Sequence, residues 1–406
     1  MSGGGGHVIG LDLGGTKLAG ALFRASGETG SLEFVRARPP MKYDEILGPG
    51  GGKIPRAERS RRIEEAMHRF IADLAGGAPA AVDAMGIATA GFIERGIVVE
   101  ARNTGMINHP LRDNVHGRAG CETYVYKDSW APVFAVALSE PAIIFSLGTG
   151  FGGVSCEADR EIKLRSRTVL RKPAWVPKLM ANDDPGYAVS FPPAGARRLI
   201  AKALDGFNAR SPESARARLP APRLESITAA LFDRARRSGK GTPRRTTVVL
   251  VKLLAGGAGL NFRPNEVFAD FFGAAALPAL FYSELTGKPV TPRELDAMLE
   301  RRDADAVLAA LVHAEFIGFI LCEMQKERVA CGLPPAARIY GTGSGYNTIT
   351  HAVLGEAVAD ALADHAAENG LNVPPPGGVH LALCPHPTSL PAFGAAVGAA
   401  MGISVG

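Results

Sequence analysis

Cysteine is scarce in this chain, and no secretion signal precedes its first strand. Five cysteines are scattered over 406 residues without a CxxC pair. Their number and spacing exclude a disulfide-stapled domain or a zinc module and favour reduced thiols in a cytoplasmic protein. The first ten residues, MSGGGGHVIG, contain neither a basic stretch nor an apolar one, so no signal peptide is predicted.

An excess of charge and a membrane-length apolar run are also lacking. The formal net charge is only +5, which does not predict a nucleic-acid partner. No residue after Glu368 has a formal charge, but prolines interrupt this stretch and its last apolar run is short. Because a membrane-spanning helix needs about 20 apolar residues, no membrane partner is predicted either. The content of 46% hydrophobic and 21% charged residues excludes general disorder, and the length predicts two or three domains.

The amino-terminal region has the pattern of two strands joined by a glycine turn. The apolar run VIGLDL is followed by Gly14 and Gly15, and the apolar run LAGALF then returns. Glycines let the N–H groups of such a turn approach phosphate oxygens. Asp12 at the strand end could hold a hydrated Mg²⁺, and Thr16 could donate a hydrogen bond to a phosphate. The motif alone is equally compatible with an ordinary hairpin turn whose amides donate to Asp12.

Two further glycine-rich turns follow later in the chain. SLGTGFGG at 146–153 joins two predicted strands, and since no helix follows it, a dinucleotide-binding fold is disfavoured. GTGSGYN at 341–347 is a strand-to-helix turn that could pack the flat face of a nucleoside on bare backbone. Its alternative is a tight loop in which Ser344 caps the helix. Each glycine motif by itself is weak evidence for a nucleotide-binding site, whereas the order and spacing of the three motifs together are stronger evidence.

Asp128 lies between the first two glycine motifs, where the strand TYVYKD meets a short predicted helix. A carboxylate at this junction could accept the proton of a substrate hydroxyl that attacks phosphorus. The alternative is an aspartate that caps the helix, and on spacing alone this alternative is favoured. Because phosphate-binding motifs lie on either side of Asp128 in the sequence, the role of proton acceptor is favoured over that of helix cap.

The remaining pattern predicts helices and loops that connect these motifs. Apolar residues at helical spacing predict a helix through Ile63–Leu74 and a long helical region over Thr291–Val329. Glycine and proline predict a loop over Pro39–Pro55. The basic residues near the end of the mixed segment 160–245 predict a solvated helix end rather than a site for a polyanion.

The order of these motifs resembles the ROK family of sugar kinases, within the superfamily of hexokinase, actin and Hsp70 ATPases. DLGGTK at 12–17 is similar to the family's first phosphate motif, and LGTGFGG at 147–153 is similar to its second. MGIATAG at 85–91 resembles its glycine-containing strand end. Asp128 matches the catalytic aspartate of the family's Asn-Asp pair, and Asn103 stands where the family has its sugar-binding asparagine.

The resemblance implies an α/β protein with the two-lobed, actin-like (ribonuclease H-like) ATPase fold. Each lobe would be a mixed sheet flanked by helices, with a helical insertion in the second lobe. Residues 1–128 would form the amino-terminal lobe, 129–389 the carboxy-terminal lobe, and 390–406 a helix that returns near the hinge. Small residues around Ala131 and Gly394 allow two short helices to cross closely there, either as a hinge or in ordinary packing.

The resemblance further implies transfer of the γ-phosphoryl group of Mg-ATP to a hydroxyl of a hexose or related sugar. Asp128 would be the general base, Asp12 would hold Mg²⁺ through water, and a homodimer is compatible with the family. The residues implied to bind ATP and its phosphates are Asp12, Gly14, Gly15, Thr16, Lys17, Gly148, Thr149, Gly150, Gly343, Ser344 and Asn347. Those implied to bind the sugar are Thr89, Asn103, Thr104, Asp128 and Glu157.

Three features depart from the family pattern. Lys127 replaces the usual asparagine, the Glu-x-Gly-His segment and zinc loop are missing beyond Gly153, and the stretch before the third glycine motif is longer than usual. Glu157 is a candidate replacement for the missing glutamate. A non-hexose polyol such as an inositol is therefore an alternative acceptor. A regulatory ATP-binding protein is a further alternative, although the expected first strand leaves no room for the helix-turn-helix module of the family's repressors.

Overall fold

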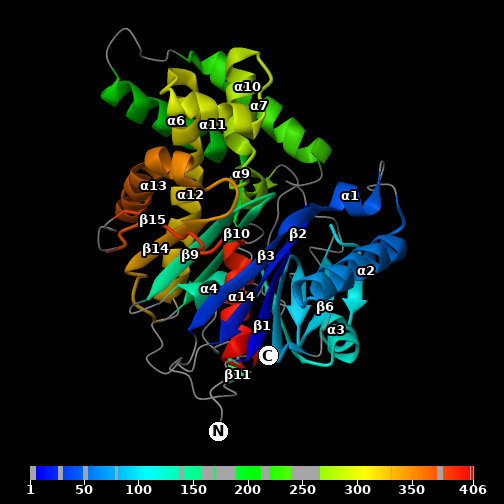
Figure 1. The fold of residues 1–406 in the computed structure, drawn as a ribbon. Coiled ribbons are helices and arrows are strands. Elements are labelled where there is room, and N and C mark those ends of the chain that lie inside the picture. The colour runs from blue at the N-terminus through cyan, green and yellow to red at the C-terminus, as the bar shows by residue number, and fades with distance from the viewer. Residues whose placement is uncertain are drawn as a thin grey trace. The chain divides into compact units, whose positions relative to one another are not determined.

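The computed structural model describes residues 6–25, 31–48, 54–77, 81–101, 103–136, 141–156, 169–170, 189–211, 219–238, 266–330, 332–372, 378–402 and 404–405. The chain divides into two compact units (Figure 1). Unit 1 comprises Met1–Ser139, Ala158–Ala174 and Ala382–Gly406, and unit 2 comprises Glu140–Glu157 and Trp175–Leu381.

A five-stranded sheet forms the centre of unit 1, with the strand order β3-β2-β1-β4-β8. Its strands are β1 (His7–Leu13), β2 (Lys17–Ala25), β3 (Leu32–Lys42), β4 (Ala84–Thr89) and β8 (Glu122–Lys127). The first three strands are antiparallel neighbours, whereas β1, β4 and β8 run parallel. The carboxyl ends of β1, β4 and β8 therefore share one edge of the sheet, which is where the candidate residues of this unit lie.

Helices and a small second sheet cover the sheet of unit 1. Apolar side chains of α2, among them Met67 and Phe70, pack in one core with Ile9 and Leu11 of β1. The other described elements of the unit are α1 (Tyr43–Leu47), α2 (Arg56–Leu74), β5 (Phe92–Glu94), β6 (Ile97–Ala101), β7 (Met106–His109), α3 (Leu111–Ala119), α4 (Ala131–Ala135), β11 (Val169–Leu170), α14 (Leu390–Ala400) and β16 (Ser404–Val405).

The carboxy-terminal helix α14, red in Figure 1, lies backbone-to-backbone on this sheet. A Cβ atom at Gly10 of β1 would lie 2.0 Å from the carbonyl oxygen of Ala392, and one at Gly86 of β4 would lie 1.9 Å from that of Ala395. Only glycine permits so close an approach of a helix to two neighbouring strands. A Cβ at Gly394 would likewise lie 1.8 Å from the carbonyl of Ala131, so α4 and α14 do cross closely.

Unit 2 repeats the combination of a glycine-turned hairpin and a parallel strand. Its sheet has the order β10-β9-β14-β15, in which β9 (Ala142–Leu147) and β10 (Phe151–Cys156) form the hairpin. β14 (Arg338–Thr342) is parallel to β9 and to the short strand β15 (His380–Leu381). Because β9 and β14 are parallel, their carboxyl ends lie at one edge of the sheet, as those of β1, β4 and β8 do in unit 1.

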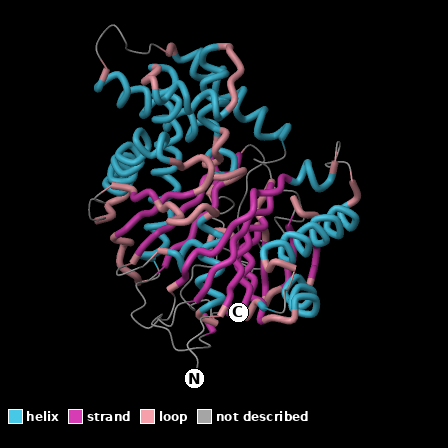
Figure 2. Tube along the Cα trace, in the orientation of Figure 1, coloured by secondary structure: helices cyan, strands magenta, loops and turns pink. Residues whose placement is uncertain are grey.

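Helices make up most of unit 2, as the tube coloured by secondary structure shows (Figure 2). Its core contains an aromatic cluster in which the rings of Phe272 and Phe316 stack 4.4 Å apart. The elements are β12 (Ser190–Phe191), α6 (Pro193–Arg210), α7 (Ala221–Ser238), β13 (Val267–Phe268), α9 (Ala269–Phe272), α10 (Leu277–Thr286), α11 (Pro292–Glu300), α12 (Ala304–Ala330) and α13 (Thr348–Glu368). By length and composition α12 could cross a membrane, but 72% of its most apolar window is buried inside the protein.

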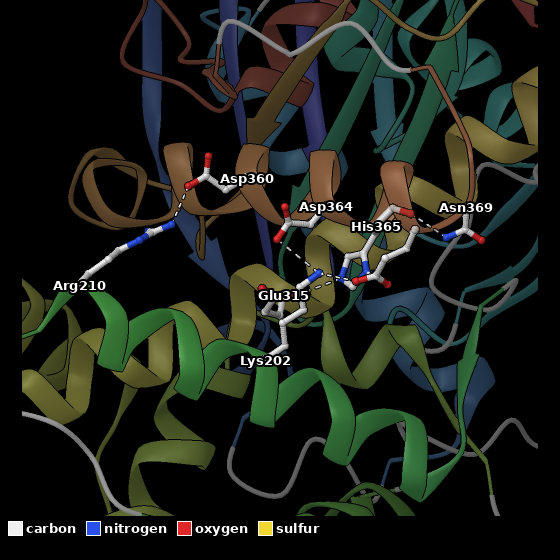
Figure 3. A network of polar contacts seen from close by, with 8 residues as sticks. Lys202, Arg210, Glu315, Asp360, Asp364, His365 and Asn369 are labelled. Atoms are coloured by element: carbon white, nitrogen blue, oxygen red, sulfur yellow. Dashed lines mark hydrogen bonds and ion pairs between the residues drawn. The ribbon is translucent and has the colours of Figure 1, made fainter.

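A network of polar contacts joins three of these helices (Figure 3). Lys202 of α6 lies 3.5 Å from the carboxylate of Asp364 and 3.0 Å from that of Glu368, both on α13. On the buried side, Nε2 of His365 is 3.1 Å from Oε2 of Glu315, which belongs to α12. The network connects α6 to α13 by ion pairs between charged side chains.

The α/β class and the mixed, helix-flanked sheets confirm the sequence prediction, with local differences. β3 extends through Pro39 and Pro40, which the sequence assigned to a loop. This is allowed because β3 is an edge strand, where a proline without an N–H group interrupts no inner ladder. The long helical region is two helices, since Arg302 has a positive φ of 59° and Asp303 caps the second helix.

The predicted lobe boundaries stay a prediction, and the two compact units divide the chain at other residues. Residues 129–139 and 382–389, predicted to lie in the second lobe, belong to unit 1. The close packing of α4 on α14 gives the physical reason, since both helices are joined to the first sheet.

Candidate active site

Asp12, Thr89 and Asp128 lie together at the shared edge of the parallel strands of unit 1. Asp12 is opposite Ala88 in the register of β1 and β4, and Thr89 is opposite Lys127 in that of β4 and β8. The N–H group of Asp128 donates to the carbonyl oxygen of Thr89 over 3.0 Å. The parallel order of the strands thus brings together carboxylates that are far apart in sequence.

The carboxylate of Asp12 is buried, with 7% of the residue exposed. Burial raises the pKa of Asp12 to about 6, and the nearby charge of Asp128 acts in the same direction. A hydrogen bond from the Ser389 hydroxyl and the charge of Lys17 partly oppose this shift. A Cβ at Gly14 would lie 3.3 Å from Oδ1 of Asp12, so the carboxylate faces the first glycine turn.

Asp128 is half-buried and follows β8 directly. Burial raises the pKa of its carboxyl group, while the charge of Lys127 and a hydrogen bond with the backbone of Ser129 lower it. The N-cap residue of α4 is Trp130, and no side chain caps that helix. The alternative role of Asp128 as a helix cap is therefore not what the structure shows.

Tyr43, the first residue of α1, holds the glycine turn of unit 1. Its hydroxyl donates to the carbonyl oxygen of Gly14 over 2.7 Å, and its N–H group donates to that of Thr16 over 2.9 Å. The N–H group of Gly14 closes the hairpin on Lys17 at 3.1 Å. The side chains of Thr16 and Lys17 are exposed, and the turn is thus fixed by its carbonyl groups.

In unit 2, the second and third glycine motifs lie against each other. Thr342 of β14 is opposite Ser146 of β9, and the N–H group of Gly345 donates to the carbonyl oxygen of Leu147 over 2.9 Å. Gly343 has a φ of 97°, and a Cβ there would lie 2.4 Å from the same carbonyl oxygen. The sequence-predicted residues thus form two groups, one in each unit.

Asp270 of α9 lies beside the second glycine turn. The sequence predicted this turn but not its contact with Asp270. Its Oδ1 accepts a hydrogen bond from the N–H group of Phe151 over 3.1 Å. A Cβ at Gly150 would lie 1.8 Å from the same oxygen, so a larger residue at this position would displace the Asp270 carboxylate. The side chain of Thr149, between Gly148 and Gly150, is exposed.

Asn347 caps the helix that follows the third motif. Its Oδ1 accepts from the N–H groups of Ile349 and Thr350 at 2.9 and 3.1 Å, and its Nδ2 donates to Asp296 over 3.3 Å. The cap is therefore Asn347 and not Ser344, which is exposed. The Asn347 side chain already makes four hydrogen bonds, so a nucleoside would have to share a side chain that is engaged within the protein.

The predicted sugar-binding residues have unequal surroundings. Thr89 is completely buried, whereas Asn103 is exposed in the turn after β6. Thr104 is buried, and its hydroxyl donates to the carbonyl of Ala101 over 3.3 Å, which stabilises that turn. Glu157 lies outside the described residues. The roles of these four residues in sugar binding stay predictions. Thr104 also stabilises the turn after β6 through its hydrogen bond to Ala101.

Two residues of the unit 1 site, Tyr43 and Ser389, were missed by sequence reasoning. Ser389 precedes Leu390 and Pro391, and a serine just before an early-turn proline is a recognisable helix-start signal. That signal predicts the cap but not the contact with Asp12. Tyr43 carries no local signal, because its contact depends on how β3 and α1 pack.

Comparison with known proteins supports this assignment of motifs. Residues 8–156 match the sequence model described as "ROK family". Among solved structures, a ROK hexokinase from Thermus thermophilus has a TM-score of 0.52 at 17% identity, covering 97% of each chain. The Listeria monocytogenes protein Lmo2764, named as a candidate N-acetylmannosamine kinase, has a TM-score of 0.52 at 14% identity, covering 96% of this chain and 97% of its own.

A third similar structure is a ROK family transcriptional regulator, a homologue of the E. coli MLC protein. Its TM-score is 0.50 at 11% identity, covering 98% of this chain and 79% of the regulator. No curated protein was found to match the sequence.

The two units, each with a glycine-turned hairpin in a mixed sheet, define an α/β protein with the two-lobed fold of ROK kinases and their actin-like relatives. Within that class, residues 8–156 are similar to the ROK family. The resemblance inferred from the motifs is confirmed, while the identities of 11 to 17% extend to the fold alone.

Proposed function

We propose that the protein is an ATP-dependent phosphotransferase that moves the γ-phosphoryl group of Mg-ATP to a hydroxyl of a hexose or related polyol. The observation that carries this proposal is the pair of carboxylates, Asp12 and Asp128, at the strand edge beside the first glycine turn. Phosphoryl transfer needs chiefly alignment and charge neutralisation, and this edge offers groups for both.

Asp128 is assigned the role of general base. Its carboxylate would accept the proton of the acceptor hydroxyl as the hydroxyl oxygen bonds to the γ-phosphorus and the bond to the ADP oxygen breaks. Burial raises the pKa of Asp128, and a raised pKa makes a carboxylate a stronger base. The charge of Lys127 opposes part of this rise in the pKa and so favours the carboxylate form of Asp128.

The donor set around Asp12 fits Mg²⁺. This ion prefers oxygen ligands, keeps several waters and binds through one or two carboxylates, and Asp12 offers such a carboxylate next to that of Asp128. Asp12 would hold the ion through water, and Asp128 lies close enough to contribute to the same negative field. When bound, the ion neutralises charge on the transferring phosphoryl group.

The glycine turns are assigned to the nucleotide. In unit 1, Tyr43 engages the carbonyl groups of Gly14 and Thr16, and the N–H group of Gly14 donates to Lys17. The amides of Gly15 and Thr16 in the same turn are therefore the ones assigned to a phosphate. In unit 2, the turn at Gly148–Gly150 is assigned to phosphate and the adjacent turn at Gly343–Gly345 to the nucleoside. The contact between these last two turns supports a single ligand for both.

The acceptor side is assigned to Asn103, which is exposed, and to Asp128 itself. A sugar-responsive regulator on the same scaffold is the second candidate, favoured by the similarity of the fold to a ROK transcriptional regulator. The two functions differ in one observable. A kinase releases ADP faster when its acceptor is added, whereas a regulator binds the sugar without turnover.

The test is a screen of ADP release against hexoses, amino sugars, pentoses and inositols, followed by substitution of the base. Asp128→Asn should lower acceptor-stimulated turnover by about 10³-fold, with nucleotide affinity nearly unchanged. Glu122→Gln is the matched control, because Glu122 is an exposed carboxylate on the same strand. Full turnover of Asp128→Asn would refute the role of Asp128, and binding of a sugar without any ADP release would favour the regulator.

A further inference from the structure

A cavity of about 600 Å³ lies in unit 1, beside the last strand of the five-stranded sheet. Its lining includes the five successive residues 122–126 of β8. Because successive side chains of a strand point to opposite faces of the sheet, a cavity that touches all five residues runs along the open edge of β8. The rest of the lining belongs to α3 and to the turn between β5 and β6.

The pairing of β8 with β4 determines which main-chain groups face this cavity. The N–H group of Asp128 donates to the carbonyl oxygen of Thr89 on β4 over 3.0 Å. Main-chain groups alternate in direction along a strand, so the even-numbered residues of β8 bond to β4. The N–H and C=O groups of Thr123 and Val125 therefore point to the open edge, with which no other described strand pairs.

These outward main-chain groups lie on residues that are nearly buried. Only 5% of Thr123 and 6% of Val125 are exposed. A main-chain polar group that is buried without a partner costs free energy comparable to a lost hydrogen bond. The carbonyl oxygen of Cys121, two residues before Thr123, accepts from Nδ1 of His116 over 2.8 Å and from the Thr123 hydroxyl over 3.1 Å. Among the described residues, the outward groups of Thr123 and Val125 have no such partner.

The walls of the cavity are fixed by contacts within unit 1. The N–H group of Arg112 in α3 donates to the carbonyl oxygen of Gly96 over 3.1 Å. A Cβ at Gly96 would lie 2.7 Å from that of Arg112, so the turn between β5 and β6 packs closely on the start of α3. His116, through its bond to Cys121, connects the other end of α3 to β8. A preformed site of this kind needs little ordering when a ligand binds.

Arg95, in the turn between β5 and β6, gives the cavity an unpaired positive charge. Its φ of 50° is a left-handed conformation that asparagine and glycine adopt more readily, so the turn by itself does not require arginine. Arg112 has Asp113 as an ionic partner at 2.9 Å, whereas Arg95 is exposed and forms no ion pair among the described residues. A carboxylate on a ligand would match this guanidinium group.

We propose that the open edge of β8 is a docking site for an extended peptide segment of another protein, which pairs with the main chain of Thr123 and Val125 and places an acidic side chain beside Arg95. An added strand supplies main-chain donors and acceptors at the spacing of β8, and pockets beside it select the side chains. The article assigns none of these three residues to the nucleotide or the sugar, so the proposal does not depend on the phosphotransferase function.

The test uses the full chain and blocked five-residue peptides of valine and threonine that carry one glutamate at each position in turn. In calorimetry, the best of these peptides should bind about tenfold more tightly than its glutamine counterpart, because a hydrogen bond to a charged group is gained. Arg95→Gln should remove this difference. Arg118→Gln is the matched control and should keep it, because Arg118 is an exposed arginine of α3 outside the cavity lining.

Two further measurements test the main-chain pairing directly. Bound peptide should slow the hydrogen exchange of the Thr123 and Val125 amides. In an added strand only alternate N–H groups face β8, so N-methylation of one alternate set of peptide amides should abolish binding, and N-methylation of the other set should not.

Three results would each overturn the proposal. They are failure of every peptide to bind, equal affinities of the two methylated forms, and a preference for glutamate that persists in Arg95→Gln. Sedimentation of the chain with and without peptide tests the remaining occupant. A dimer that the peptide dissociates would assign the edge of β8 to a second copy of the chain, which would also overturn docking of another protein.

Discussion

Asp12 lies near the carboxyl end of β1 and Asp128 directly follows β8, and the charge of Asp128 raises the pKa of Asp12. Only β4 separates the two strands. Two carboxylates held this close in a buried position cost folding free energy, which is commonly tolerated where the charges are used in binding or catalysis. Substitution of these two carboxylates should therefore change both the stability of the protein and its turnover.

The cost of burying Asp12 should appear in the pH dependence of stability. Its pKa is about 6 in the folded state, above the ordinary aspartate value of 3.8, so the folded state binds the proton more tightly. The contribution to stability is then fully present below about pH 4 and is lost as pH rises to about 6, by about 3 kcal/mol. Asp12→Asn should remove this loss and be more stable than the wild type at pH 7.5, while acceptor-stimulated turnover disappears.

Urea unfolding at a series of pH values between 4 and 8 measures this effect. The stability difference between Asp12→Asn and the wild type should grow with pH over that range. Glu33→Gln is the control, because Glu33 is an exposed carboxylate on β3 of the same sheet. A difference that stays constant with pH would show that the charge of Asp12 is not the source of the cost.

Tyr43→Phe should loosen the first glycine turn without changing the carboxylates. The substitution removes the hydrogen bond from the Tyr43 hydroxyl to Gly14 and leaves the carbonyl group of Gly14 without this donor. The expected loss of stability is about 1 kcal/mol. KM for ATP should rise several-fold while kcat changes little, and steady-state kinetics with varied ATP separate the two. A fall in kcat alone, with KM unchanged, would contradict a role in shaping the turn.

Gly86→Ala should destabilise the protein strongly, because the new Cβ would lie 1.9 Å from the carbonyl oxygen of Ala395. The neighbouring atom is helix backbone, which cannot rotate away as a side chain could. The expected loss is about 3 kcal/mol, as for severe overpacking. Thermal unfolding measures it, and Gly117→Ala is the control. Gly117 lies in α3 with no heavy atom within 4 Å, so alanine there should stabilise by about 0.5–1 kcal/mol.

The sequence predicted the parts of the site that depend on local pattern. The glycine turns after β1, β9 and β14 follow from short apolar runs that end in glycine, and the structure has all three. The position of Asp128 at a strand end was equally readable. The strand-to-helix turn at 341–347 also predicted the helix α13 that follows it.

What the sequence could not predict are contacts that depend on packing between distant segments. Ser389 meets Asp12 only because α14 lies on β1 in one register, set by backbone contacts at Gly10 and Gly86. Asp270 reaches the turn of Phe151 from a helix of four residues, too short for a periodic signal. The alternative in which Ser344 caps the helix is wrong, since Asn347 is one of the strongest N-cap residues and lies directly before the helix.

Asp270 should matter for the nucleotide turn of unit 2. Its Oδ1 holds the N–H group of Phe151, next to Gly150. Asp270→Ala would release the turn, so affinity for Mg-ADP should fall by about five- to tenfold, as expected for a lost hydrogen bond to a charged acceptor. Asp270→Asn keeps an oxygen acceptor and should lose less. Asp233→Ala is the control, because Asp233 is an exposed aspartate of the same unit that contacts Arg236. Calorimetric titration compares the three variants, and equal affinities for Asp270→Ala and the wild type would show that the turn keeps its shape without the carboxylate.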